Sequence, residues 1–210
     1  MRARRRIVHG ALVALALIPL AGLAVGALRG DLGANPVETV AHATGEWTLR
    51  LLLATLAVTP LRRILGRPGL APYRRTLGLL AFSYACLHFS TYVALDLTFD
   101  LGAVAEDVAK RPYITVGFTA FCLLVPLAAT STRAMVRRLG RRWVTLHRLV
   151  YIAAMLGVVH FLWLVKADLR EPLLYAGVLA VLLGSRLWQR TLRSSPHAQR
   201  EVALGGSPEA

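Results

Sequence analysis

The sequence predicts an all-α integral membrane protein, a bundle of six transmembrane helices with both termini in the cytoplasm. Of its 210 residues, 56% are hydrophobic and only 17% are charged, whereas soluble domains carry about 25% charged residues. An α-helix needs roughly 20 apolar residues to cross the bilayer. Six segments approach this length: about residues 7–28, 46–61, 76–95, 113–130, 144–165 and 172–188. They are too uniformly apolar for the alternating strands of a membrane barrel.

The charge distribution predicts the orientation of these helices. The formal net charge is +14, but the basic residues do not form one surface. They cluster in residues 2–6, 62–75, 133–142 and 186–200. Acidic residues occupy the alternate connections, within residues 31–46, 96–107 and 168–171. Because cytoplasmic loops of membrane proteins are enriched in lysine and arginine, both termini are expected in the cytoplasm. The pattern also argues against nucleic-acid binding.

The first apolar segment has two readings. Its basic start followed by residues 7–28 resembles a secretory signal, but the apolar part of a signal is only about 7–15 residues long. This run has 22 residues, so we expect a retained helix that Pro19 can kink. The later segments carry tryptophans at their predicted ends, as aromatic residues at a membrane interface do: Trp47, Trp143, Trp163 and Trp188.

Residues 1–190 are predicted to form one membrane domain. Residues 191–210 are polar and rich in Ser, Pro and Gly, which is typical of a disordered tail, here cytoplasmic. No internal repeat is visible in the sequence, and it contains no P-loop, Rossmann fingerprint or nucleophile elbow. We therefore assign no catalytic residue.

Three histidines lie inside the apolar segments: His88, His147 and His160. An ionisable side chain at membrane depth is costly and by default marks a functional site. Imidazole is also a common axial ligand of haem iron, so these residues are predicted to ligate the iron of one or two haems. No C-x-x-C-H motif surrounds Cys86 or Cys122, so the haem is expected to be non-covalent haem b. The remaining histidines, His9, His42 and His197, are expected to be solvated.

The helical rise predicts which histidines share a level. His88 follows Arg75 by 13 residues, or ~20 Å of helix. His160 follows Arg142 by 18 residues, or ~27 Å, while His147 follows it by only 5, or ~8 Å. His88 and His160 are therefore expected to hold one haem in the outer half of the membrane, with His147 near the cytoplasmic side.

The local sequences carry a resemblance. Around His88, His147 and His160 the sequence resembles the ferric-reductase-like transmembrane family. Members of that family carry paired histidines on each of two helices, spaced as His147 and His160 are here. Before His88 the corresponding position is Arg74. With this departure, the sequence more narrowly resembles the MsrQ (also YedZ) family, the haem-binding membrane subunits of bacterial methionine-sulfoxide reductase systems. Four segments carry this narrower resemblance: RRTLGLLAFSYACLHFSTYVALDL, RPYITVGFTAFCLLVPLAATS, LGRRWVTLHRLVY and HFLWLVKADLREPLLYA. The resemblance covers about residues 7–190.

The resemblance implies b-type haem, bound FMN and a multi-pass position in the bacterial inner membrane. It also implies a heterodimeric partner, the periplasmic molybdopterin reductase MsrP, which repairs oxidised methionine in periplasmic proteins. The chain would then be an electron-transfer subunit rather than a catalytic one, passing electrons from the quinone pool or a reduced flavin. Two alternatives are a stand-alone ferric or metal reductase-type electron carrier and a non-redox membrane scaffold.

The inner site is open to two interpretations. A 13-residue step leaves about 140° between His147 and His160 on an ideal helix. Either this helix is locally irregular, for example near Gly157, or two haems approach it from different sides. We hypothesise that His147 ligates an inner haem, with Arg74 at its other face or its propionates. Arg75 and Arg148 are further candidates for propionate contacts, because guanidinium matches carboxylate geometry.

Overall fold

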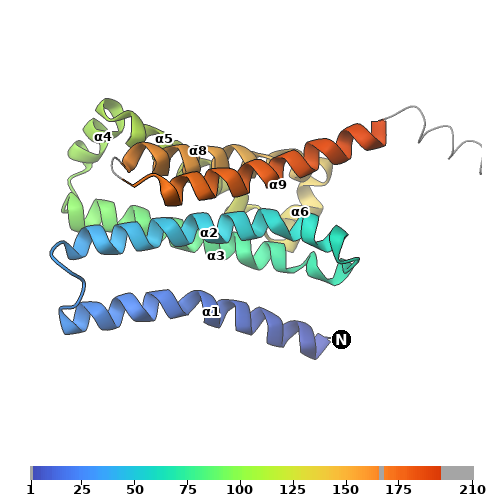
Figure 1. Ribbon diagram of the computed structural model, residues 1–210, viewed down its shortest axis with the longest axis horizontal. Coiled ribbons are helices and arrows are strands. Elements are labelled where there is room, and N and C mark those ends of the chain that lie inside the picture. The colour runs from blue at the N-terminus through green and yellow to red at the C-terminus, as the bar shows by residue number, and fades with distance from the viewer. Residues whose placement is uncertain (1, 166–167, 195–210) are drawn as a thin grey trace, which may run out of the picture.

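The computed structural model describes residues 2–165 and 168–194, and these residues form helices without a β-strand. Figure 1 shows the long helices running side by side as a bundle. They are α1 (Arg2–Arg29), α2 (Pro36–Ile64), α3 (Tyr73–Thr91), α5 (Pro112–Ala129), α8 (Leu149–Leu164) and α9 (Arg170–Ser194). The shorter helices are η1 (Pro68–Leu70), η2 (Tyr92–Asp96), α4 (Leu101–Lys110), α6 (Arg133–Leu139) and α7 (Arg141–Leu146). The predicted all-α class is confirmed.

Four helical stretches in the described residues are long and apolar enough to cross a membrane: Arg6–Arg29, Pro68–Asp96, Pro112–Ala129 and Arg141–Leu164. The other two predicted spans correspond to α2 and α9, which are helices of similar length but carry charged residues along them, such as Arg50 and Arg186. The number of six spans and the orientation of the termini therefore stay predictions.

Helix α2 begins well before the predicted residue 46. The side chain of Asn35 accepts a hydrogen bond from the backbone N–H of Glu38 at 3.2 Å, and Pro36 occupies the first turn. Both features favour a helix start. Hydropathy did not reveal this start, because the first turns of α2 are polar.

Two helix pairs form the centre of the bundle, α2 with α3 and α5 with α8, and α9 packs against both α2 and α8. Small residues lie where these helices meet: Ala81, Ala153 and Ala154 are at most 1% exposed. Small side chains let membrane helices approach closely. Helix α1 stands at the side of the bundle (Figure 1), against α3. There the hydroxyl of Tyr84 donates a hydrogen bond to the carbonyl of Ala16.

Two further segments differ from the sequence prediction. The acidic connection after α3 contains α4, whose first turn is capped by the Asp100 carboxylate, which accepts from Ala103 N–H at 3.0 Å. Helix α9 continues to Ser194, so residues 191–194 of the predicted tail are helical. The rest of the predicted tail, including His197, lies outside the described residues.

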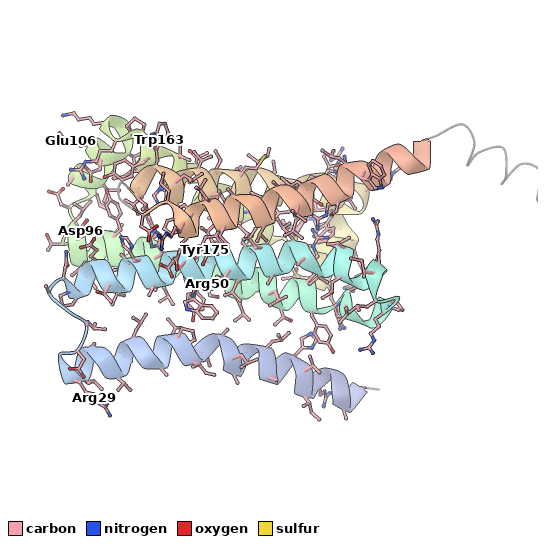
Figure 2. The ribbon with its side chains drawn as sticks, viewed as in Figure 1. Arg29, Arg50, Asp96, Glu106, Trp163 and Tyr175 are labelled. Carbon is pink, nitrogen blue, oxygen red and sulfur yellow. The ribbon has the colours of Figure 1, made fainter. Side chains whose placement is uncertain are left out.

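A polar network joins α2 to α9. The Nε of Arg50 donates to the hydroxyl of Tyr175 at 2.8 Å, and its Nη2 donates to Glu46 at 2.8 Å. Figure 2 shows Arg50 and Tyr175 facing each other between the two helices. The guanidinium also lies 5.2 Å from the centre of the Trp47 ring. A charge on an apolar helix is tolerated when it is paired in this way.

We expect Tyr175→Phe to lower stability by about 1 kcal/mol, because interhelical hydrogen bonds in membrane proteins contribute about 0.6 kcal/mol on average and up to about 1.7. The midpoint of thermal unfolding in detergent should fall by about 2–4 °C. Tyr151→Phe is the matched control, since the Tyr151 hydroxyl makes no hydrogen bond within the described residues. Equal midpoints for the two variants would show that the network does not hold α9.

Candidate functional site

His88 on α3 and His160 on α8 face each other across the bundle. Their ring centres lie 6.3 Å apart, with the ring planes at 69°. Both rings line a cavity of about 430 Å³, the first cavity, whose wall includes Leu49, Phe89 and Phe121. The structure thus brings together the two histidines that were expected to share a level.

Each ring is held by a backbone carbonyl of a neighbouring helix. The Nδ1 of His88 lies 2.9 Å from the carbonyl oxygen of Ala41 on α2. The Nδ1 of His160 lies 2.7 Å from the carbonyl oxygen of Tyr113 on α5. A carbonyl can only accept, so Nδ1 carries the hydrogen and Nε2 keeps its lone pair. Nε2 of neither ring makes a hydrogen bond within the described residues. This is the usual arrangement of metal-ligating histidines.

The distance between the rings fits one metal ion. A metal–imidazole bond of about 2 Å, added to roughly 1.1 Å from ring centre to nitrogen, places two opposed ring centres about 6.3 Å apart. The observed separation is 6.3 Å. Within the described residues no group of three or more His, Cys, Asp or Glu could hold an ion by itself. Two imidazoles alone suit a group that brings its own equatorial ligands, as haem does.

His147 lies apart from this pair, in the turn between α7 and α8. It lines a second cavity, of about 450 Å³, together with Arg74, Arg75 and Trp143. Its Nδ1 is 3.2 Å from the carbonyl oxygen of Trp143, and its ring stacks on the Trp143 ring at 3.8 Å. The backbone of Leu127 is close enough to interact with the ring. Nε2 is buried and makes no hydrogen bond in the described part of the chain.

The irregularity suggested near Gly157 is not there. Helix α8 runs through Gly157 without interruption, and the break falls at His147 and Arg148. Gly157 instead gives space to a neighbouring helix, because an added Cβ would come within 3.1 Å of Leu49. The predicted segment is therefore irregular, as the first interpretation proposed, but at His147 rather than at Gly157, and His147 and His160 line different cavities.

Arginines surround the second cavity. Arg74 and Arg75 line it, as expected, and Arg74 is close enough to His147 for their charges to interact. Arg148 is not among its lining residues. Sequence reasoning did not single out Arg62, which also lines this cavity and belongs to the same basic cluster.

The two cavities are neighbours. Leu52 of α2 and Leu124 of α5 line both of them, so the two spaces share part of their walls. The first cavity lies toward the end of the bundle that carries α4, and the second toward the end that carries α6 (Figure 1). This places two chemically distinct spaces in series along the bundle.

A second polar network lies at the α4 end of the first cavity, and sequence reasoning missed it. The hydroxyl of Tyr92 donates to Asp107 at 2.9 Å, and the Nε of Arg111 lies 3.1 Å from the same carboxylate. Interactions with Tyr113 and Asp107 raise the pKa of Arg111 above its already high ordinary value, so this cation at the cavity wall stays charged. His42 also lines the cavity, 3.8 Å from Glu38.

Comparison with known proteins defines the class. Residues 44–158 match the family described as ferric reductase like transmembrane component, a span that includes His88 and His147 and ends two residues before His160. The chain belongs to this family and is a multi-pass membrane protein.

Curated relatives narrow the assignment to MsrQ. A protein of Xanthomonas campestris pv. campestris (strain 8004) is 54% identical over 84% of this chain and 79% of its own length. A protein of Rhodospirillum rubrum is 52% identical over 89% of this chain and 90% of its own length. Both are named protein-methionine-sulfoxide reductase heme-binding subunit MsrQ. No solved structure matches the chain.

Proposed function

We propose that this chain binds haem b and carries electrons across the bacterial inner membrane to a periplasmic methionine-sulfoxide reductase, as an electron-transfer subunit rather than the catalytic one. The observation that carries the proposal is the pair of neutral imidazoles, His88 and His160, 6.3 Å apart with Nε2 unpaired in a shared cavity. The names of the relatives, which are haem-binding subunits, agree with this chemistry.

His88 and His160 would hold the outer haem through Nε2. Haem iron, when bound, supplies one-electron chemistry, while the protein sets binding, orientation and potential. The carbonyls of Ala41 and Tyr113 accept the Nδ1 hydrogens, which fixes the tautomer and raises the basicity of both ligands. Leu49, Phe89 and Phe121 give the cavity an apolar wall beside the two ligands.

His147 would ligate a second, inner haem in the second cavity. Its buried Nε2 has no hydrogen bond, and a buried nitrogen without a partner is costly, which supports a ligand there. Arg74 would lie at the other face or bind propionates, with Arg62 and Arg75 adding positive charge. FMN remains part of the proposal through the relationship to MsrQ, and no residue is assigned to it.

The proposed route runs from the α6 end to the α4 end. Six helices would cross the lipid, with both termini in the cytoplasm. Electrons from the quinone pool or a reduced flavin would enter at the arginine-lined second cavity. They would leave from the first cavity to MsrP, the periplasmic molybdopterin reductase. The shared wall of Leu52 and Leu124 supports transfer between the cavities.

The test is purification from haem-replete cells, followed by quantification of haem and flavin per protein. The proposal expects b-type haem and oxidation of the dithionite-reduced protein when purified MsrP and a methionine sulfoxide substrate are added. Oxidation by ferric chelates but not by MsrP would favour a stand-alone metal reductase. A purified protein without bound haem would contradict both electron-transfer functions and favour a non-redox scaffold.

A further inference from the structure

The two halves of the histidine pair are built alike. In the first half, α2 supplies the Ala41 carbonyl to His88 of α3; in the second, α5 supplies the Tyr113 carbonyl to His160 of α8. Acceptor and histidine are separated by 47 residues in both halves. One helical turn after each acceptor stands a glycine, Gly45 in α2 and Gly117 in α5. The pattern was not visible as a sequence repeat, since most other residues of the two halves differ.

Both glycines contact the imidazole ring of their own half. A Cβ added at Gly117 would lie 2.7 Å from Nδ1 and 2.8 Å from Cε1 of His160. A Cβ added at Gly45 would lie 3.1 Å from Cε1 and 3.2 Å from Nδ1 of His88. Any side chain at Gly117 would therefore displace the ring, and one at Gly45 would crowd it.

Helix formation does not explain these glycines. Glycine inside a helix is about 1 kcal/mol less favourable than alanine. Neither Gly45 nor Gly117 has the positive φ that would require glycine. Both glycines lie close to an imidazole ring. The Nδ1 hydrogen of that ring bonds to a carbonyl that lies one helical turn before the glycine.

We propose that Gly45 and Gly117 are positioning residues for haem ligation: each lets an imidazole lie against the neighbouring helix, so that Nδ1 reaches its carbonyl and Nε2 is directed to the iron. The inference rests on the proposed function. A side chain at either glycine would weaken the hydrogen bond from Nδ1–H to the carbonyl. A weaker hydrogen bond lowers the basicity of the histidine ligand. A less basic ligand stabilises ferric iron less, so the reduction potential of the outer haem should rise.

The test compares three alanine variants of the full chain, purified in detergent. In Gly117→Ala we expect haem binding to weaken about tenfold or more, as changes to the partners of metal ligands do. In Gly45→Ala, where the contact is looser, we expect haem to be retained with a raised potential and an altered low-spin spectrum. The matched control is Gly177→Ala in α9, where an added Cβ meets nothing within 4 Å; it should match the wild type.

The readouts separate positioning from general damage. A purely structural effect lowers yield or unfolding temperature but leaves the potential and spectrum of the folded fraction unchanged. Gly45→Ala and Gly117→Ala proteins that match the control in potential, spectrum and haem content would overturn the inference. If the Gly117→Ala protein cannot be purified in folded form, the potential and spectrum of Gly45→Ala decide the question. Wild-type protein without haem would instead contradict the proposed function itself.

Discussion

His160→Ala is expected to remove the outer haem. The cavity between α3 and α8 offers two imidazoles to one iron, 6.3 Å apart between ring centres, and alanine leaves only His88. His88→Ala should have the same effect. Because the two residues act as a unit, the double variant should lose little more than either single variant. Haem per protein, measured on purified wild type and variants, checks this.

The control for this experiment is His42→Ala. His42 also lines the first cavity, but its side chain is 41% exposed and its Nε2 lies 3.8 Å from Glu38, so we do not expect it to ligate the iron. We expect this variant to keep its full haem content. Loss of haem from His42→Ala but not from His160→Ala would mean that the ligands are wrongly assigned.

His147→Ala is expected to remove the inner haem and leave the outer one in place. The second cavity contains this histidine, and its buried Nε2 makes no hydrogen bond to the described residues. Haem content should therefore fall by about half relative to a wild type with two haems, since haem iron is held mainly by its axial ligands. The low-spin signal assigned to His88 and His160 should persist.

Arg74→Gln and Arg75→Gln refine the inner site. Both arginines line the second cavity, and Arg74 is close enough to His147 for their charges to interact. We expect Arg74→Gln to alter the spectrum of the inner haem more than Arg75→Gln does. Unchanged haem stoichiometry and spectra in His147→Ala would show that the second cavity does not hold haem.

The sequence predicted the histidine pair because helical rise is regular. Counting residues from Arg75 and Arg142 predicted that His88 and His160 share one level, and the structure places their ring centres 6.3 Å apart. The same counting separated His147 from them. The α-helical class followed from apolar length, which dominates in lipid because backbone groups must be paired internally.

Other features depend on contacts that a single sequence does not reveal. The helix breaks at His147, where the sequence has no proline or glycine to indicate a break. The irregularity was predicted near Gly157 instead, but that glycine gives space to Leu49. The roles of Gly45 and Gly117 depend on rings that are distant in sequence. The start of α2 depends on the Asn35 cap, which hydropathy does not detect.

The central claim is that one iron is bound between His88 and His160. A low-temperature electron paramagnetic resonance spectrum of the oxidised protein, taken beside the His88→Ala and His160→Ala variants, tests it most directly. The account predicts a low-spin ferric signal typical of two imidazole ligands in the wild type, and its loss or conversion to high spin in each variant. A low-spin signal that survives both substitutions, or a wild type with only high-spin iron, would contradict it.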